Sequence, residues 1–139
     1  MASKSEDVAS MDELEPDELL QMCCEGVPFT GVAVEFHLNG ARRSEIEYVQ
    51  GVQSGGSRDY SLEGVLVYEA RYLNGGLHGL VREWFPNGCV KSEAQYEFGI
   101  EVNYREWNTS GELVESRAIS PESQLFPILK DRRRAHEQA

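Results

Sequence analysis

Acidic residues recur at a fixed interval along this chain, and carboxylates held in a regular array attract cations and basic proteins. One column has steps of 24, 24 and 23 residues: Glu35, Asp59, Glu83 and Glu106. A second column repeats every 24 residues: Glu45, Glu69 and Glu93. Catalysis requires an acid, a base or a nucleophile that converge on one point. Evenly spaced carboxylates do not converge, so the two columns indicate electrostatic binding.

The remaining reactive residues do not form a catalytic or metal-binding motif. His37 and His78 lie at different offsets within the period, and Ser, Cys and Asp residues do not cluster around either of them. Cys23 and Cys24 are adjacent, Cys89 is remote from both, and the histidines lack the spacing of zinc ligands. No glycine-rich phosphate loop precedes a helix. We therefore expect no catalytic residues, no metal ligands and no cofactor, and we expect that the protein is not an enzyme.

Length and composition are those of one folded domain. The chain has 139 residues, of which 40% are hydrophobic, so it can form a hydrophobic core. No apolar run approaches the roughly 18 residues of a membrane span. The N-terminus lacks the basic and then apolar order of a secretory signal. The three cysteines are an odd number, which does not suit a disulfide framework. Together these features predict a cytoplasmic protein.

The net charge of −11 is concentrated near the N-terminus. Residues 1–25 contain eight acidic residues and one lysine, whereas the last ten residues contain four basic and two acidic ones. An acidic surface repels nucleic acid and anionic lipid, and it steers basic proteins towards itself. The charge therefore favours a basic protein partner and no direct contact with nucleic acid.

The carboxylates are set by a repeating unit. Glycines at positions 40, 64, 88 and 111 keep the same step, and a constant period is typical of repeat architectures. In the third unit, β-prone runs flank Pro86-Asn87-Gly88, and Asn-Gly between such runs is a strong hairpin signal. We therefore predict an all-β fold: an elongated antiparallel sheet of about four stacked β-hairpins with a 24-residue period and a short C-terminal helix.

Strand alternation predicts that each face of this sheet carries a different set of residues. One face is predicted to be packed and to carry Phe36, Tyr60, Trp84, Trp107, Ile46, Tyr48, Ala70, Tyr72, Ala94 and Tyr96, with Arg58, Arg82 and Arg105 on the same side. The opposite face is predicted to carry all seven acids of the two columns. Stacked hairpins advance by about 10 Å, close to the Debye length of about 8 Å, so acids within a column repel weakly. These seven acids are our candidate partner-binding residues.

The chain ends should differ from the repeats, because terminal units of a stacked fold act as caps. Residues 1–25 form an acidic leader, of which 1–10 are expected to be disordered. The stretch 12–26 fits a degenerate returning strand, and within it 13–22 fits a short helical turn equally well. Residues 26–119 are the repeat domain. Residues 120–139 are predicted to start a helix at Ser120, to cover the last hairpin, and to end in a basic tail.

Three segments resemble the bacterial variant of the MORN repeat, and within it the YwqK-type antitoxin family. They are Pro28-Phe-Thr-Gly31, Trp84-Phe-Pro-Asn-Gly88 and Arg105-Glu-Trp-Asn-Thr-Ser-Gly111. The likeness covers roughly residues 26–115. The second unit departs from the pattern, since Tyr60-Ser-Leu-Glu-Gly64 replaces Trp and Asn-Gly. The resemblance implies an immunity or antitoxin protein that binds a cognate toxin, and it implies no catalytic residues.

Two interpretations of function follow. In the first, the acidic face binds a basic toxin that acts on nucleic acid or nucleotides. In the second, the chain is a MORN-type scaffold or membrane-associated interaction module. A membrane-associated module needs a basic, apolar face, and here only the cluster Arg132–Arg134 is basic. The acidic composition therefore favours the first interpretation.

Overall fold

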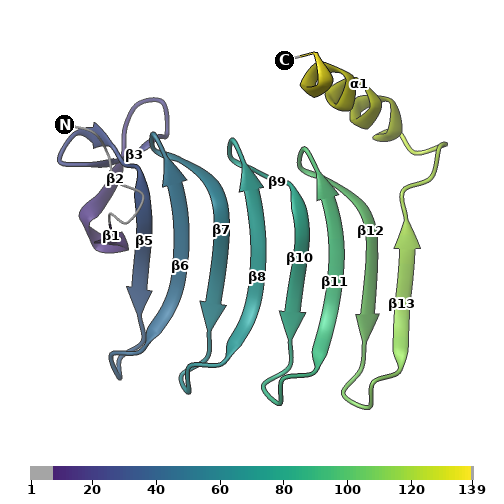
Figure 1. The fold of residues 1–139 in the computed structure, drawn as a ribbon, viewed down its shortest axis with the longest axis horizontal. Coiled ribbons are helices and arrows are strands. Elements are labelled where there is room, and N and C mark those ends of the chain that lie inside the picture. Colours follow the sequence, from purple (N-terminus) through teal and green to yellow (C-terminus); the bar gives the residue numbers. More distant parts are fainter. Residues whose placement is uncertain (1–7, 139) are drawn as a thin grey trace.

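The main sheet is built from hairpins stacked side by side in chain order. The computed structural model describes residues 8–138. Within them a ten-stranded sheet has the order β1-β5-β6-β7-β8-β10-β11-β12-β13, with β9 pairing with β8 (Figure 1). The strands are β1 (Val8–Ser10), β5 (Gly31–Phe36), β6 (Arg42–Val49), β7 (Val52–Tyr60), β8 (Leu66–Leu73), β9 (Gly76–Leu77), β10 (Gly79–Trp84), β11 (Val90–Glu97), β12 (Ile100–Trp107) and β13 (Leu113–Ala118). The predicted all-β class, elongated antiparallel sheet and short C-terminal helix are confirmed.

Each hairpin turns at the glycine that marks the repeat. In the first hairpin the N–H of Gly40 donates to the carbonyl of His37 at 2.9 Å, and Gly40 has a φ of 88°. Gly64, Gly88 and Gly111 make the equivalent bond, and their φ values are 85°, 91° and 83°. A positive φ costs glycine little, which is why glycine repeats at this position.

Successive hairpins are joined by a second glycine turn. Gln50-Gly51, Asn74-Gly75 and Phe98-Gly99 all have positive φ at both residues. Two consecutive positive φ values define the tight turn whose twist suits antiparallel strands. Both ends of every unit are therefore closed by short turns, and the sheet grows by two strands for each period.

A β-bulge in every hairpin reverses part of the predicted arrangement of faces. Glu35 pairs with Ser44, whereas its neighbour Phe36 pairs with Arg42, so Arg43 is an extra residue. The same shift leaves one extra residue in each of the other three hairpins: Val67, Lys91 and Val114. One inserted residue moves every later side chain of that strand to the opposite face. The prediction that all seven acids share one face was therefore wrong.

The first described strand closes one edge of the sheet. β1 runs parallel to β5, with Ala9 opposite Ala33. The predicted disorder of residues 1–10 is therefore wrong for 8–10, and its remainder lies outside the described residues. A 3-10 turn follows β1 (η1, Met11–Glu13), and then a three-stranded sheet of β2 (Leu14–Pro16), β3 (Met22–Cys24) and β4 (Val27–Pro28). Of the two alternatives for this stretch, the structure supports the strand at 22–24.

The segment from β1 to Phe29, which we call the N-terminal cap, provides the main hydrophobic cluster. Ala9, Leu14 and Phe29 are buried against Ala33 and Tyr48 of the main sheet. The cap is also hydrogen-bonded to the turn between the first two hairpins. The N–H of Met22 donates to the carbonyl of Gly51 at 2.8 Å, and the N–H of Gly51 donates to the carbonyl of Phe29 at 2.7 Å. The cap therefore covers the sheet at its N-terminal end.

The C-terminal helix α1 (Phe126–Glu137) lies over the strand ends and not over the last hairpin (Figure 1). Arg132 donates to the carbonyl of Phe98 at 2.6 Å, and the ring centre of His136 lies 5.3 Å from that of Phe98. The prediction that the helix starts at Ser120 was wrong. The Ser120 hydroxyl instead accepts a hydrogen bond from the N–H of Glu122 at 3.1 Å, which stabilises a turn before the helix. Pro127 lies in the first turn of the helix, where its missing N–H costs nothing.

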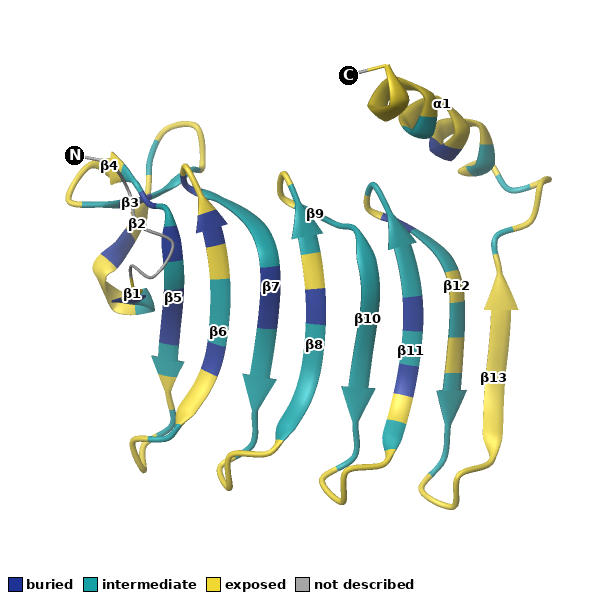
Figure 2. Cartoon of the chain, in the orientation of Figure 1, coloured by how far each residue is buried: buried dark blue, intermediate teal, exposed yellow. Residues whose placement is uncertain are grey.

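Beyond the cap, the main sheet forms a single layer. Among the described residues, Leu129 of α1 is the only large side chain that is fully buried. Figure 2 shows intermediate exposure along most strands and full exposure along β13. Ala70 has no exposed surface although no second layer covers it, so neighbouring side chains must close over it. Both faces of the sheet are therefore available over most of its length.

Candidate protein-binding face

One face of the sheet collects most of the tyrosines, and we call it the tyrosine face. The register of paired strands places five of the six tyrosines on it: Tyr48, Tyr68, Tyr72, Tyr96 and Tyr104. Alanine and serine lie between them, among which Ala70, Ala94, Ser57 and Ser92 are buried. Partly exposed aromatic side chains beside small residues are common in protein-binding surfaces, where tyrosine is enriched.

A row of carboxylates crosses the tyrosine face near the hairpin turns. Strand by strand, the paired residues are Glu35, Ser44, Asp59, Tyr68, Glu83, Ser92, Glu106 and Glu115. We call this the carboxylate row. Neighbouring strands are about 4.8 Å apart, so acids on alternate strands are about 10 Å apart. The first predicted column is thus brought into one line, with hydroxyl groups between its members.

Hydroxyl groups hold the carboxylates of this row in place. Ser44 donates to Glu35 at 3.2 Å and Ser92 donates to Glu83 at 3.1 Å. Tyr104 donates to Glu106 at 2.8 Å. A hydroxyl bond orients a carboxylate but does not cancel its charge, as an arginine would.

Most of the row lacks a cation. Arg43 donates to Glu35 at 3.0 Å, so this acid is paired. Within residues 8–138, Asp59, Glu83 and Glu106 form no ion pair. The middle of the row therefore keeps a net negative charge.

Burial and the negative field act together on two neighbours in the row. Burial raises the pKa of Asp59 above its ordinary value, with a further rise from Glu35 that is opposed by Arg43. Burial also raises the pKa of Tyr68 to about 12, helped by the neighbouring Tyr72, Asp59 and Glu83. Partial desolvation at the centre of the row strengthens any ion pair that a bound cation would form there.

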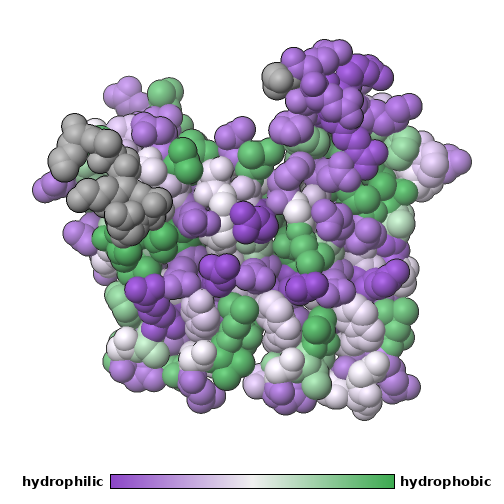
Figure 3. All heavy atoms as spheres, viewed as in Figure 1, coloured by the Kyte–Doolittle hydropathy of each residue, from purple (hydrophilic) through white to green (hydrophobic). Residues whose placement is uncertain are grey.

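The opposite face carries the second acid column in a different environment, and we call it the ion-pair face. Its central row runs Val34, Glu45, Arg58, Glu69, Arg82, Glu93, Arg105 and Ser116. Arg58 donates to Glu69 and Arg82 donates to Glu93, both at 2.8 Å. In Figure 3 a band of hydrophilic side chains crosses the strands of the visible face at mid-height. Here acids and arginines alternate, so their charges cancel.

Glu45 shows how these acids are compensated. Burial acts to raise its pKa, but hydrogen bonds from Tyr60 and Arg42 and the charge of Arg42 bring it below its ordinary value. Tyr60 donates at 2.8 Å. The predicted location of the arginine column beside the aromatic column holds, since Arg58 and Tyr60 share this face. The prediction that the column of Tyr48, Tyr72 and Tyr96 shares it as well was wrong, because the bulges place that column on the tyrosine face. The structure thus separates the candidate acids into the carboxylate row and a neutralised set.

An arginine of the chain itself already occupies the tyrosine face. The guanidinium carbon of Arg117 lies 4.0 Å from the centre of the Tyr104 ring. Its nitrogens donate to Glu101 at 2.8 and 3.0 Å and to Glu115 at 2.9 Å. These hydrogen bonds raise the pKa of Arg117 above its ordinary value. A tyrosine ring and two carboxylates together therefore form a complete arginine site on this face.

The cap limits how much of the tyrosine face is open. Tyr48 is buried in the cluster with Leu14 and Phe29. Tyr68, Tyr96 and Tyr104 lie further along the sheet and are half-buried. The open part of the face therefore extends from the second hairpin to the fourth.

Two kinds of site were not found in the described part of the chain, a metal-binding cluster and a membrane-spanning helix. Across residues 8–138, no three His, Cys, Asp or Glu side chains lie where they could hold a metal ion. No helix in that part of the chain is long and apolar enough to span a membrane.

Sequence reasoning did not find the serines of the carboxylate row. Ser44 and Ser92 lie 48 residues apart, which is two periods, so their spacing carried a signal. The unit between them has Tyr68 at this position, which interrupts the column. The role of the serines depends on the bulge that places them beside Glu35 and Glu83.

Comparison with known proteins identifies part of the repeat. Residues 77–97 match the family profile of the MORN repeat variant. A MORN repeat is consistent with a scaffold for protein interactions. No curated protein sequence matches this chain.

Among the solved structures that match this chain, one aligns with most of its length. It is described as the crystal structure of accessory secretory protein 1, 2 and 3 in Streptococcus pneumoniae, with 17% identity and a TM-score of 0.39. The alignment covers 94% of this chain and 23% of that one, so the chain spans about a quarter of its length.

Proposed function

We propose that this chain is a non-catalytic binding module that holds a basic protein partner against its tyrosine face. The observation that carries the proposal is the contrast between the two rows. On the ion-pair face, Arg58 and Arg82 neutralise the acids beside them. On the tyrosine face, Asp59, Glu83 and Glu106 stay unpaired within the described residues. A partner with positive charge would complete the second row and not the first.

The geometry at Arg117 supports arginine as the main contact from the partner. Arg117 uses a ring below and carboxylates beside it. Tyr68 has a similar setting, because it lies between Asp59 and Glu83 in the carboxylate row. Arginine stacks on aromatic rings and bonds carboxylates through two nitrogens at once, which lysine does not do. The partner's arginines would therefore lie over the tyrosines between the acids.

At finer detail, we propose that the partner is a cognate toxin and that the chain neutralises it as an antitoxin or immunity protein. Proteins that act on nucleic acid have basic surfaces around their sites. A line of carboxylates about 10 Å apart can cover such a surface. The three free cysteines suit a reducing compartment such as the cytoplasm. Long-range attraction would speed capture, and buried aromatic contacts would slow release.

The experiment compares matched variants that have the same net charge. Glu83→Gln with Glu106→Gln removes two charges from the tyrosine face, whereas Glu69→Gln with Glu93→Gln removes two from the ion-pair face. Each tagged protein is used to capture partners from its native cells, and the association rate of the captured protein is then measured at several salt concentrations. We expect the first pair to lower the rate about tenfold and to flatten its salt dependence. The second pair should leave both unchanged.

Equal effects of the two pairs would show that net charge alone matters, and the tyrosine face would lose its role. Capture of a partner that is not basic would also contradict the proposed role of the tyrosine face. The antitoxin proposal is tested separately, by producing the captured protein in cells with and without this chain. Equal growth in the two cultures would refute neutralisation while leaving the binding face in place.

A further inference from the structure

The strand β13 forms an open edge of the main sheet. It pairs with β12 on one side, and no strand in the described range pairs with its other side. All six of its residues are exposed, as Figure 2 shows along its length. The helix α1 does not cover this edge, because it bonds to Phe98 and Glu97 at the strand ends. At the other end of the strand order, the edge strand is the three-residue β1, which begins the N-terminal cap.

The backbone direction along β13 fixes which groups face outward. The N–H of Ile119 donates to the carbonyl of Val102 at 2.8 Å, so the backbone groups of Ile119 point towards β12. In an antiparallel pair the inward and outward groups alternate along the strand. Those of Arg117 and Glu115 therefore point inward, and those of Ser116 and Ala118 point away from the sheet. An edge with free N–H and C=O groups is a template for another strand.

We propose that this edge pairs with the same edge of a second copy of the chain, in antiparallel orientation about a two-fold axis at Ser116. The charges of the strand select this register. An axis at residue 115 would place Glu115 opposite its own copy, and an axis at residue 117 would do the same to Arg117. An axis at Ser116 places Glu115 opposite Arg117 of the second copy. Opposite charges across a strand pair stabilise it, and like charges destabilise it.

The apolar residues of the strand agree with the same register. Leu113 is 54% exposed and Val114 is 52% exposed in the single chain. With the axis at Ser116, Val114 lies opposite Ala118 of the second copy, and Leu113 lies opposite Ile119. Pairing therefore places the exposed Leu113 and Val114 against apolar residues of the second copy at both ends of the contact.

The symmetry has a consequence for the tyrosine face. Residues that are directly opposite in an antiparallel pair lie on the same side of the sheet. The two copies would therefore present their tyrosine faces to the same side, with Tyr104 and Arg117 of each copy flanking the junction. The dimer would be one continuous sheet with a doubled binding face.

The first test is the oligomeric state of the full chain, measured by sedimentation equilibrium over a range of concentrations. We expect a dimer for the natural sequence. Ser116→Pro removes the outward N–H without removing a bond to β12, and edge strands tolerate proline at such positions. We expect this variant to dimerise at least about tenfold more weakly, because two inter-chain hydrogen bonds are lost. Ser116→Thr keeps the N–H and is the matched control, which should dimerise normally.

The second test fixes the register by cross-linking. Ser116→Cys in a Cys89→Ser background places two thiols across the axis, where directly bonded partners have Cα atoms about 5.5 Å apart. This distance suits a disulfide. We expect oxidation to join the two chains. Ser110→Cys at the tip of the last hairpin is the control and should not cross-link, since the dimer places these tips at opposite ends of the contact.

Charge reversal gives a third readout. Arg117→Glu alone should weaken the dimer, and Glu115→Arg combined with Arg117→Glu should restore it. A natural chain that stays monomeric at all concentrations would overturn the proposal. A dimer that survives Ser116→Pro and does not cross-link at position 116 would overturn it as well.

Discussion

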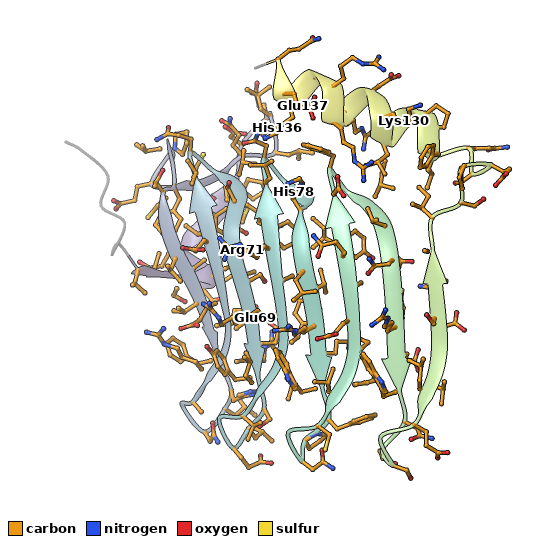
Figure 4. The ribbon with its side chains drawn as sticks, turned by 45° about the vertical axis from the view of Figure 1, so that its right-hand side comes forward. Glu69, Arg71, His78, Lys130, His136 and Glu137 are labelled. Atoms are coloured by element: carbon orange, nitrogen blue, oxygen red, sulfur yellow. The ribbon has the colours of Figure 1, made fainter. Side chains whose placement is uncertain are left out.

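Arg133 on α1 and Glu97 at the end of β11 form an ion pair with two hydrogen bonds, at 2.7 and 2.8 Å. The two residues are 36 positions apart in the chain, so the pair ties the helix to the third hairpin. Figure 4 shows His78 and His136 near the same junction, between the strand ends and the helix. Their ring centres are 6.4 Å apart, and both lie beside Phe98. The helix is therefore held by this ion pair and the aromatic cluster, together with the hydrogen bond from Arg132 to Phe98 and the buried Leu129.

Removal of this ion pair should loosen the helix. We expect Arg133→Ala to increase hydrogen exchange in residues 126–137 several-fold, while exchange in β10 to β12 stays unchanged. Arg134→Ala is the matched control, because Arg134 is exposed and its ion pair within residues 8–138 is with Asp131 of the same helix, at 3.5 Å. Unchanged exchange in both variants would mean that the aromatic cluster and Leu129 are sufficient to hold the helix.

The same ion pair should make helix docking depend on pH. Hydrogen bonds and charge from Arg133 hold the pKa of Glu97 below its ordinary value of 4.5. A carboxyl group with a lowered folded-state pKa contributes stability above its unfolded value and loses it as pH falls through the folded value. The helix should therefore detach below about pH 4.5, which amide chemical shifts of residues 126–137 would report. Glu97→Gln should remove this transition, and Glu137→Gln at the exposed end of the helix should retain it.

Gly51 should tolerate substitution less well than Gly64, although both have a positive φ, of 81° and 85°. A left-handed backbone costs a residue with a Cβ about 1–2 kcal/mol, so alanine carries this cost at either position. A Cβ at Gly51 would lie 2.8 Å from the Cβ of Gln21 and 2.9 Å from the carbonyl oxygen of Met22, whereas one at Gly64 meets nothing within 4 Å. In urea denaturation we expect Gly51→Ala to be clearly less stable than Gly64→Ala. Equal losses would show that the cap shifts to accommodate the new methyl group.

The hairpins and turns could be predicted because a single residue type marks each of them. Gly40 and Gly88 repeat since their φ values, 88° and 91°, suit glycine alone among ordinary residues. The bulges could not be predicted in this way. Their extra residues include Arg43, Val67 and Lys91, which occupy the same place in the period but share no residue type that marks a bulge.

The extra residue of each bulge determines on which face of the sheet the candidate acids lie. Without the bulge at Arg43, Glu35 would pair with Arg43 and share a face with Glu45. With it, Glu35 pairs with Ser44, and Glu45 lies on the opposite face beside Arg58. Docking of α1 was also beyond the sequence, because many acids are equivalent partners for Arg133 until the fold brings Glu97 to it. Period and composition were therefore predictable, whereas the side of the sheet and the long-range contacts were not.

Ala70 should be intolerant of larger side chains. It has no exposed surface and lies on the tyrosine face opposite Ser57. Overpacking a filled site costs about 1–3 kcal/mol, so we expect Ala70→Leu to lower the free energy of unfolding by this amount. Arg71→Leu is the control, since it places the same side chain on the same strand at an exposed position of the other face. If both variants unfold at the same denaturant concentration, the floor of the tyrosine face is not tightly packed.

Tyr68 should be the last tyrosine to ionise as the pH is raised. Burial, with help from Tyr72, Asp59 and Glu83, raises its pKa from 10.0 to about 12. A group whose folded-state pKa is raised contributes stability that is present below the unfolded value and lost as pH rises through the folded value. Between pH 10 and about pH 12 the natural protein should therefore lose more stability than Tyr68→Phe, which has no phenol to ionise at this site. In a titration followed by tyrosinate absorbance, the step at the highest pH should be lost in Tyr68→Phe. The same step should remain in Tyr60→Phe, because Tyr60 lies on the ion-pair face. A step at the highest pH that persists in Tyr68→Phe would show that the centre of the carboxylate row is well hydrated, and the desolvation that strengthens cation binding there would be absent.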